Sequence, residues 1–165
     1  MTAPDFATDF ATIFARDLGT VRAEILAYPD DASPWVLPPG APNSGGTLVL
    51  HLCGNLRHFI GAGLGRSGYV RDRDAEFQAR GTSRAELAEL VHVTAAEVGR
   101  SLEGLEAARL DETMTIGPIA CSVRRGLLHL AVHLTYHMGQ LDYHRRIVTG
   151  DASGVSALPL APLTS

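Results

Sequence analysis

Three histidines lie four residues apart in the segment LHLAVHLTYHMGQ: His129, His133 and His137. On a helix, side chains at i and i+4 are neighbours with Cβ atoms about 5–6 Å apart, so His133 and His137 can bind one cation together. His129 lies two turns, about 12 Å, from His137 and is too far away to be a third ligand. A single buried histidine more often just hydrogen-bonds a carbonyl or a carboxylate, but this pair favours a metal site. The remaining ligand must come from another helix.

A second helix, expected over residues 47–64, offers two histidines for that role. His51 and His58 both lie off the centre of its apolar stripe, with Asn55 between them on the polar side, so the pattern leaves either open. His92 falls outside the stripe of its own helix and is expected at the surface. His144 is two turns from His137 and suits a supporting or packing role.

Four helical segments are indicated by apolar residues that recur every three or four positions, and almost no segment alternates as a strand does. Ser83, with Glu86 three residues on, is a capping box that opens the third helix. Four amphipathic helices predict an all-α fold, a four-helix bundle with long crossover loops. We place the bundle in residues 1–150 and a Pro-, Ser- and Ala-rich tail in residues 151–165, expected to be a surface strap or disordered. The expected helices are 5–28, 47–64, 83 to about 108, and about 122 to 149, with irregular stretches at 29–46 and 65–81.

The last helix is apolar on two flanks. One flank carries Leu127, Leu130, Leu134, Met138 and Leu141, and the other carries Val132, Tyr136 and Tyr143. His133, His137 and His144 fall between the two flanks, so their imidazoles are expected to point into the bundle.

Composition and charge exclude several classes of partner. The formal net charge of −4 provides no positive field for nucleic acid or for an anionic membrane. The first residues lack the basic start and apolar core of a signal peptide, and no apolar stretch is long enough to span a bilayer, so a cytoplasmic location is expected. Cys53 and Cys121 have no CxxC spacing and are expected to be small buried hydrophobic residues.

The pairing of HLCGNLRH in the second helix with HLTYHMGQL in the last resembles the DinB/YfiT-like superfamily of four-helix-bundle metalloproteins, over residues from about 5 to 149. The most specific match is His-x-x-x-His-x-Gly-Gln, which is here His133, His137, Gly139 and Gln140. In that superfamily the ligand from the second helix precedes a Gly-Asn pair, here Gly54 and Asn55, so the resemblance selects His51. The linker GYVRDRDAEF also resembles an uncharacterised branch of the superfamily.

Three imidazoles leave the coordination shell of a cation incomplete, which is typical of catalytic sites. Such ligands suit zinc, nickel or iron without distinguishing among these metals. The chain has no HExxH motif, so a zinc protease is disfavoured. The resemblance implies a metal-dependent transferase that activates a low-molecular-weight thiol, such as bacillithiol or mycothiol, for attack on a small electrophile. It also implies a homodimer. The alternative is a non-catalytic, stress-associated metal-binding bundle.

Several residues near the histidines have two interpretations. Gln140 and Tyr136 can orient a substrate, or Gly139 can permit close helix packing while Gln140 satisfies a buried carbonyl. Arg71 and Arg73 alternate with aspartates, which is typical of surface ion pairs, but either guanidinium can instead bind a carboxylate of the thiol cosubstrate.

Overall fold

The computed structural model describes residues 6–155 and 157–163. Asp5, the predicted start of the first helix, lies outside the described residues. So do residues 1–4 of the predicted bundle and residues 156, 164 and 165 of the predicted tail. The elements are α1 (Phe6–Leu26), the 3-10 turn η1 (Ser33–Trp35), α2 (Gly45–Leu56), the π-helix η2 (Arg57–Ala62), α3 (Arg73–Gln78), α4 (Arg84–Glu103), the 3-10 helix η3 (Ala107–Asp111), β1 (Thr113–Ile116), β2 (Ile119–Ser122), α5 (Val123–Thr149) and the 3-10 turn η4 (Ala161–Leu163).

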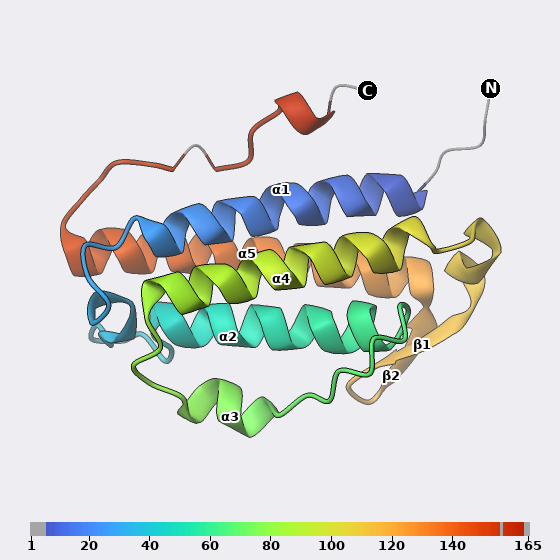
Figure 1. Ribbon diagram of the computed structural model, residues 1–165, viewed down its shortest axis with the longest axis horizontal. Coiled ribbons are helices and arrows are strands. Elements are labelled where there is room, and N and C mark those ends of the chain that lie inside the picture. Colours follow the sequence, from blue (N-terminus) through green and yellow to red (C-terminus); the bar gives the residue numbers. More distant parts are fainter. Residues whose placement is uncertain (1–5, 156, 164–165) are drawn as a thin grey trace.

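The four long helices α1, α2, α4 and α5 lie alongside one another, which confirms the predicted all-α bundle (Figure 1). α1 packs against α4 and α5, and α2 packs against α4, α5 and the short α3. One apolar core lies between the long helices and includes side chains from each, among them Phe14, Leu52, Leu102 and Leu130.

Side-chain caps determine where three of these helices begin. Ser83 and Glu86 form the predicted capping box of α4. Ser122 accepts a hydrogen bond from the backbone N–H of Arg125 at the start of α5. Ser44 accepts from Thr47 N–H in the same way, so α2 begins at Gly45, two residues earlier than the periodicity predicts.

Three local elements differ from the sequence-based expectation. The second helix continues beyond Leu56 as a π-helix, and the linker after it contains α3. The predicted third helix, α4, ends at Glu103, and its expected continuation toward Ala108 is a turn followed by η3. β1 and β2 form an antiparallel hairpin whose four-residue strands are too short for alternation to indicate them, with Gly117 in its turn at a φ of +56°. Cys121 lies on β2 and is only half-buried, whereas Cys53 is buried as predicted.

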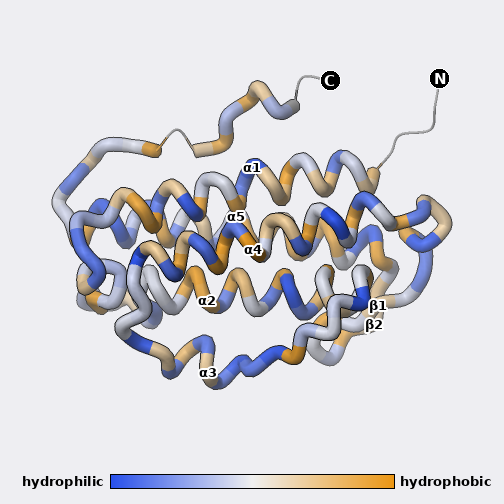
Figure 2. Tube along the Cα trace, viewed as in Figure 1, coloured by the Kyte–Doolittle hydropathy of each residue, from blue (hydrophilic) through white to orange (hydrophobic). Residues whose placement is uncertain are grey.

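The second apolar flank of the last helix faces outward. Val132, Tyr136 and Tyr143 are 63–69% exposed, while Leu130, Leu134 and Leu141 are fully buried. The core therefore covers only one side of α5, and a row of apolar side chains follows its solvent side. The segment between α2 and α4 that carries α3 is largely hydrophilic by contrast (Figure 2).

The tail forms a strap on the bundle surface. The buried guanidinium of Arg145 donates to Glu24 Oε2 at 2.5 Å and to the carbonyl of Ser153 at 2.7 Å, which fixes the start of the tail. Further along, η4 lies against α1 (Figure 1). Among the described residues, none of the helices combines the length and apolarity needed to cross a membrane.

Candidate metal centre

His51 of α2 lies next to His133 and His137 of α5, between the two helices. Taking one ligand nitrogen from each imidazole, the three nitrogens lie within 4.8 Å of one another. His51 Nε2 and His133 Nε2 are 3.3 Å apart. Two nitrogens that each bind a tetrahedral zinc at about 2.0–2.1 Å are separated by roughly 3.3–3.4 Å. The three side chains predicted as ligands therefore lie close enough together to hold one metal ion.

Glu76 of α3 supports His51 from the side opposite the other imidazoles. His51 Nδ1 donates to Glu76 Oε2 at 3.1 Å, which leaves Nε2 with a free lone pair. Arg71 in turn donates two hydrogen bonds to the same carboxylate, at 2.6 and 2.8 Å. A carboxylate on the second nitrogen of a ligating imidazole is typical of metal sites, where it fixes the tautomer and the ring orientation.

Gln140 performs the equivalent role for His137. His137 Nδ1 donates to the side-chain oxygen of Gln140 at 2.7 Å, which again leaves Nε2 as the nitrogen with a lone pair. The predicted donation to a buried carbonyl is not seen, because Gln140 is exposed and its amide nitrogen has no hydrogen-bond partner among the described residues. His133 Nδ1 is buried without a hydrogen-bond partner among the described residues. Because His133 Nε2 faces His51, His133 would ligate through Nε2, and its Nδ1 lacks the supporting partner that the other two imidazoles have.

Burial favours the neutral form of His133 and His51. Burial, together with the neighbouring His137, His51 and His129, lowers the pKa of His133 to about 4. Burial also lowers the pKa of His51, opposed by its hydrogen bond to Glu76. A neutral imidazole has the lone pair that ligation requires, so at neutral pH no proton has to be displaced from these two side chains.

The other four histidines lie outside this cluster. His58 is exposed on η2 with its ring edge against Phe59, and His129 is exposed one turn before His133, with ring centroids 6.1 Å apart. His92 is exposed on α4, as predicted. His144 is buried and has the predicted packing role: its Nε2 donates to the Val36 carbonyl at 2.8 Å, and its Nδ1 accepts from the Tyr28 hydroxyl at 2.6 Å.

The structure distinguishes between the two interpretations that the sequence allows for four further residues: Arg71, Arg73, Tyr136 and Gly139. Arg71 makes an ion pair, but with Glu76 and with 11% of its side chain exposed, so this is a buried pair and not a surface Arg–Asp pair. Arg73 instead stacks over Phe77, its guanidinium carbon 4.9 Å from the ring centroid. Gly139 does not serve close helix packing, since a Cβ there would meet nothing within 4 Å. Tyr136 is 63% exposed, with its ring edge-on to His137 at 5.2 Å.

Glu76 is the residue of this site that sequence reasoning missed. Its signal was present in the linker: Asp72 accepts from the N–H of Ala75 as a helix cap, and the one-and-a-half-turn helix that follows carries Glu76. A capped helix so short has too few residues for periodicity to indicate which side is buried. Its contact with His51, 25 residues away, depends on how the linker folds back onto α2.

Comparison with known protein families matches residues 13–159 to a family described as a protein of unknown function, DUF1572. No curated protein and no solved structure matches the chain. The matched range includes all three clustered histidines, Glu76 and Gln140, and it extends over nearly the whole bundle. The chain therefore belongs to the DUF1572 family.

Proposed function

We propose that the chain binds one divalent transition-metal ion through His51, His133 and His137, and that it is a metal-dependent transferase of the DinB/YfiT-like superfamily. The observation that carries the metal proposal is the set of three clustered imidazoles, two of them oriented by Glu76 and Gln140. Imidazole ligation fits zinc, nickel or iron. The His-x-x-x-His-x-Gly-Gln pattern supports the superfamily assignment.

The three-ligand set supports the chemical proposal because it leaves at least one coordination position open. When bound, a divalent cation supplies the Lewis acidity that favours a thiolate over a thiol, and the thiolate is the nucleophile. The chain itself favours neutral His51 and His133 by burial, and it orients His51 and His137 through Glu76 and Gln140. Arg71 donates two hydrogen bonds to Glu76, so its guanidinium fixes that carboxylate.

A histidine scan tests the metal proposal. Each of His51→Ala, His133→Ala and His137→Ala should remove most of the bound metal, because two imidazoles leave too many positions to water. His58→Ala, His92→Ala and His129→Ala are matched controls on the same helices or at the surface and should retain it. Elemental analysis of the purified variants measures the outcome. Loss of metal in His58→Ala with retention in His51→Ala would place the ion about 10 Å further along the second helix.

A thiol-consumption assay tests the transferase proposal. The metal-loaded protein is mixed with a bimane-type electrophile and, in turn, with several low-molecular-weight thiols. Turnover that disappears in His137→Ala and persists in His92→Ala supports the proposal. Stoichiometric metal without turnover of any thiol favours the second candidate function, a metal-binding bundle without catalysis. The contact between His51 of α2 and His133 of α5 favours that alternative, because a cation bound there would link the two helices and stabilise the bundle.

A further inference from the structure

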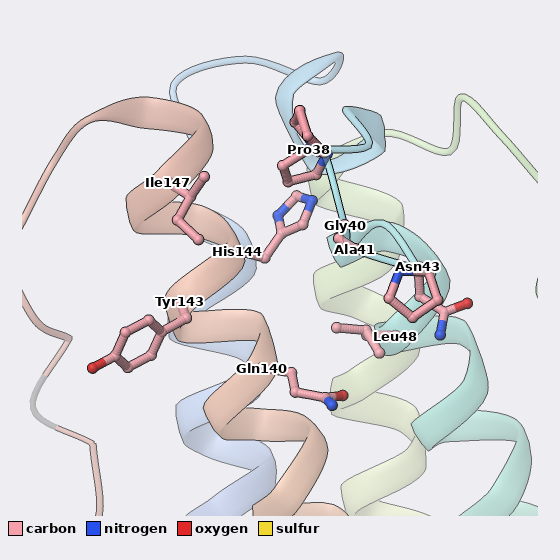
Figure 3. A pocket seen from close by; sticks show the side chains of 11 residues that line it. Pro38, Gly40, Ala41, Asn43, Leu48, Gln140, Tyr143, His144 and Ile147 are labelled. Carbon is pink, nitrogen blue, oxygen red and sulfur yellow. The ribbon is translucent and has the colours of Figure 1, made fainter.

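A groove opens beside the histidine cluster, between α5 and the proline-rich loop that precedes α2. Its volume is about 390 Å³, within the range of small-molecule sites. Its walls are formed by the loop residues 38–43, by Leu48 of α2, and by Gln140, Tyr143, His144 and Ile147 of α5. Figure 3 shows Leu48 and Gln140 extending into the space between the helices, while Tyr143 points away from it.

The lining is suited to an uncharged occupant. None of the described residues around the groove is Lys, Arg, Asp or Glu. His144 is the only titratable imidazole there, and both of its nitrogens are engaged with Tyr28 and Val36, so it presents ring carbon to the groove. A charged ligand would lose its hydration without gaining a counter-charge, whereas an apolar one gains from burial against proline, leucine and isoleucine.

The wall of the groove is held in place before any ligand arrives. Trp35 donates its indole N–H to the carbonyl of Thr82 at 2.9 Å and lies against Gly46, where any Cβ would come within 2.8 Å of the ring. His144 holds Val36 against α5 through a hydrogen bond to its carbonyl. The prolines between Val36 and α2 restrict the rest of the loop backbone. A preformed wall lowers the entropy cost of binding, which distinguishes this groove from a gap under a mobile loop.

Gln140 connects the groove to the histidine cluster. Its side-chain oxygen is occupied by His137 Nδ1, while its amide nitrogen has no hydrogen-bond partner among the described residues. Leu48 and His51 are one turn apart on α2, and His137 and Gln140 are one turn apart on α5, so the groove and the cluster lie next to each other along the two helices. A ligand in the groove can accept a hydrogen bond from this amide and extend toward the imidazoles.

We propose that this groove binds an uncharged, largely apolar small molecule that carries an oxygen acceptor for the Gln140 amide, and that this molecule is the electrophilic cosubstrate. The second clause rests on the proposed function, whereas the binding site itself does not. Ile147, which is 65% exposed on α5 and lines the groove, is the residue that tests the site without disturbing the core.

Fluorine NMR with para-fluorobenzyl alcohol, an uncharged probe, measures binding to the metal-loaded protein. We expect saturable line broadening that is weakened about tenfold or more by Ile147→Glu, since a carboxylate replaces apolar contact there. Val132→Glu is the matched control: it is an equally exposed aliphatic residue on the same side of α5 but outside the groove, so any effect on self-association is shared. The isosteric cation para-fluorobenzylammonium should bind the wild-type protein at least tenfold more weakly.

The fluorine line of the bound probe should be broader in cobalt-loaded protein than in zinc-loaded protein. Cobalt is paramagnetic, and the groove lies about one turn from the histidines. Equal affinities of Ile147→Glu and Val132→Glu, or equal binding of the alcohol and the ammonium, would overturn the groove as the site. If the protein binds no metal but Ile147→Glu still weakens probe binding and Val132→Glu does not, the groove is the binding site and the proposed function is refuted. Probe binding without a cobalt effect in metal-loaded protein would refute the link to the histidine cluster.

Discussion

At the scale of single residues, the candidate site depends on the hydrogen bonds behind the imidazoles as much as on the imidazoles. Glu76 and Gln140 each occupy the Nδ1 of one histidine and so present Nε2 to the cluster. Arg71 then holds Glu76 with two hydrogen bonds. These hydrogen bonds explain how His51 and His137, which come from separate helices and are only half-buried, each keep one ring orientation.

Glu76→Gln should therefore reduce metal affinity by about 10–100-fold, the usual cost of losing such a supporting carboxylate. A competition titration against a chromogenic chelator measures the affinity. Asp74→Asn is the control, because Asp74 is an exposed carboxylate on the same short helix. If both variants bind metal equally well, Glu76 does not orient His51 for ligation.

His144 provides a test of pH dependence. Burial lowers the pKa of His144, opposed by its hydrogen bond to the Val36 carbonyl. The unfolded chain thus binds a proton near pH 6.5 that the folded protein does not, so the free energy of unfolding should fall as pH decreases through about 6.5, by at most about 1.4 kcal/mol per pH unit for one proton. His144→Phe should be less stable than the wild-type protein at pH 7. Between pH 7 and 5, however, its free energy of unfolding should fall by less than that of the wild-type protein. Denaturant titrations of chelated protein measure both slopes, and parallel slopes would contradict the assignment.

At the scale of elements, the close approach of α3 to α2 requires a glycine. A Cβ on Gly54 would lie 2.0 Å from Glu76 Oε1, and one on Gly61 would lie 2.1 Å from Glu97 Oε1. Gly54 is the glycine of the Gly-Asn pair, and the structure gives a physical reason for it: the carboxylate that supports His51 lies directly against the α2 backbone. The position of the Glu76 carboxylate therefore depends on the absence of a side chain at Gly54.

Gly54→Ala should displace Glu76, costing about 1–3 kcal/mol of stability and weakening metal binding together. Gly99→Ala in α4 is the control, because its Cβ would meet nothing within 4 Å and should stabilise the helix by about 0.4–1 kcal/mol. Denaturant titration and metal competition on both variants give the comparison. A Gly54→Ala protein with unchanged metal affinity would separate Glu76 from the site.

At the scale of the whole molecule, a cation held by the cluster would connect α2 and α5. Because such a ligand binds only the folded state, chelation should lower the melting temperature by roughly 5–10 °C for a site about 99% occupied. Differential scanning calorimetry before and after chelation measures this shift, with His51→Ala as the control that should not respond. An unchanged melting temperature in wild-type protein that carried metal would contradict a role of the ion in stability.

The exposed apolar row on α5 bears on assembly, for which a homodimer stays a prediction. Leu128, Val132, Tyr136, Tyr143 and Ile147 are all more than half exposed along one helix. Burying them against a second copy would remove this apolar surface from water. Sedimentation equilibrium should report a dimer that Tyr136→Glu weakens and that Leu26→Glu, an exposed leucine on α1, does not. A particle of 17.6 kDa across micromolar concentrations would rule out the dimer.

The sequence by itself determined what depends on neighbouring residues. The 3.6-residue period defined four amphipathic helices and placed His133 and His137 on one side of the last one, and the Ser83 and Glu86 box marked a helix start. The choice of His51 over His58 needed the family resemblance, because both residues satisfy the same local pattern. A two-turn displacement along one helix leaves the periodicity unchanged, so only the packing of α2 on α5 separates them.

Only the tertiary structure decided the contacts between distant segments. The pairing of Glu76 with His51 depends on the path of the 65–82 linker, and the groove depends on where the proline-rich loop meets α5. The outward direction of the second apolar flank of α5 was also decided there, because a four-helix bundle offers each helix one interior side, and a helix with two apolar flanks can bury only one of them. Local periodicity describes both flanks equally well and carries no information about which one the other helices cover.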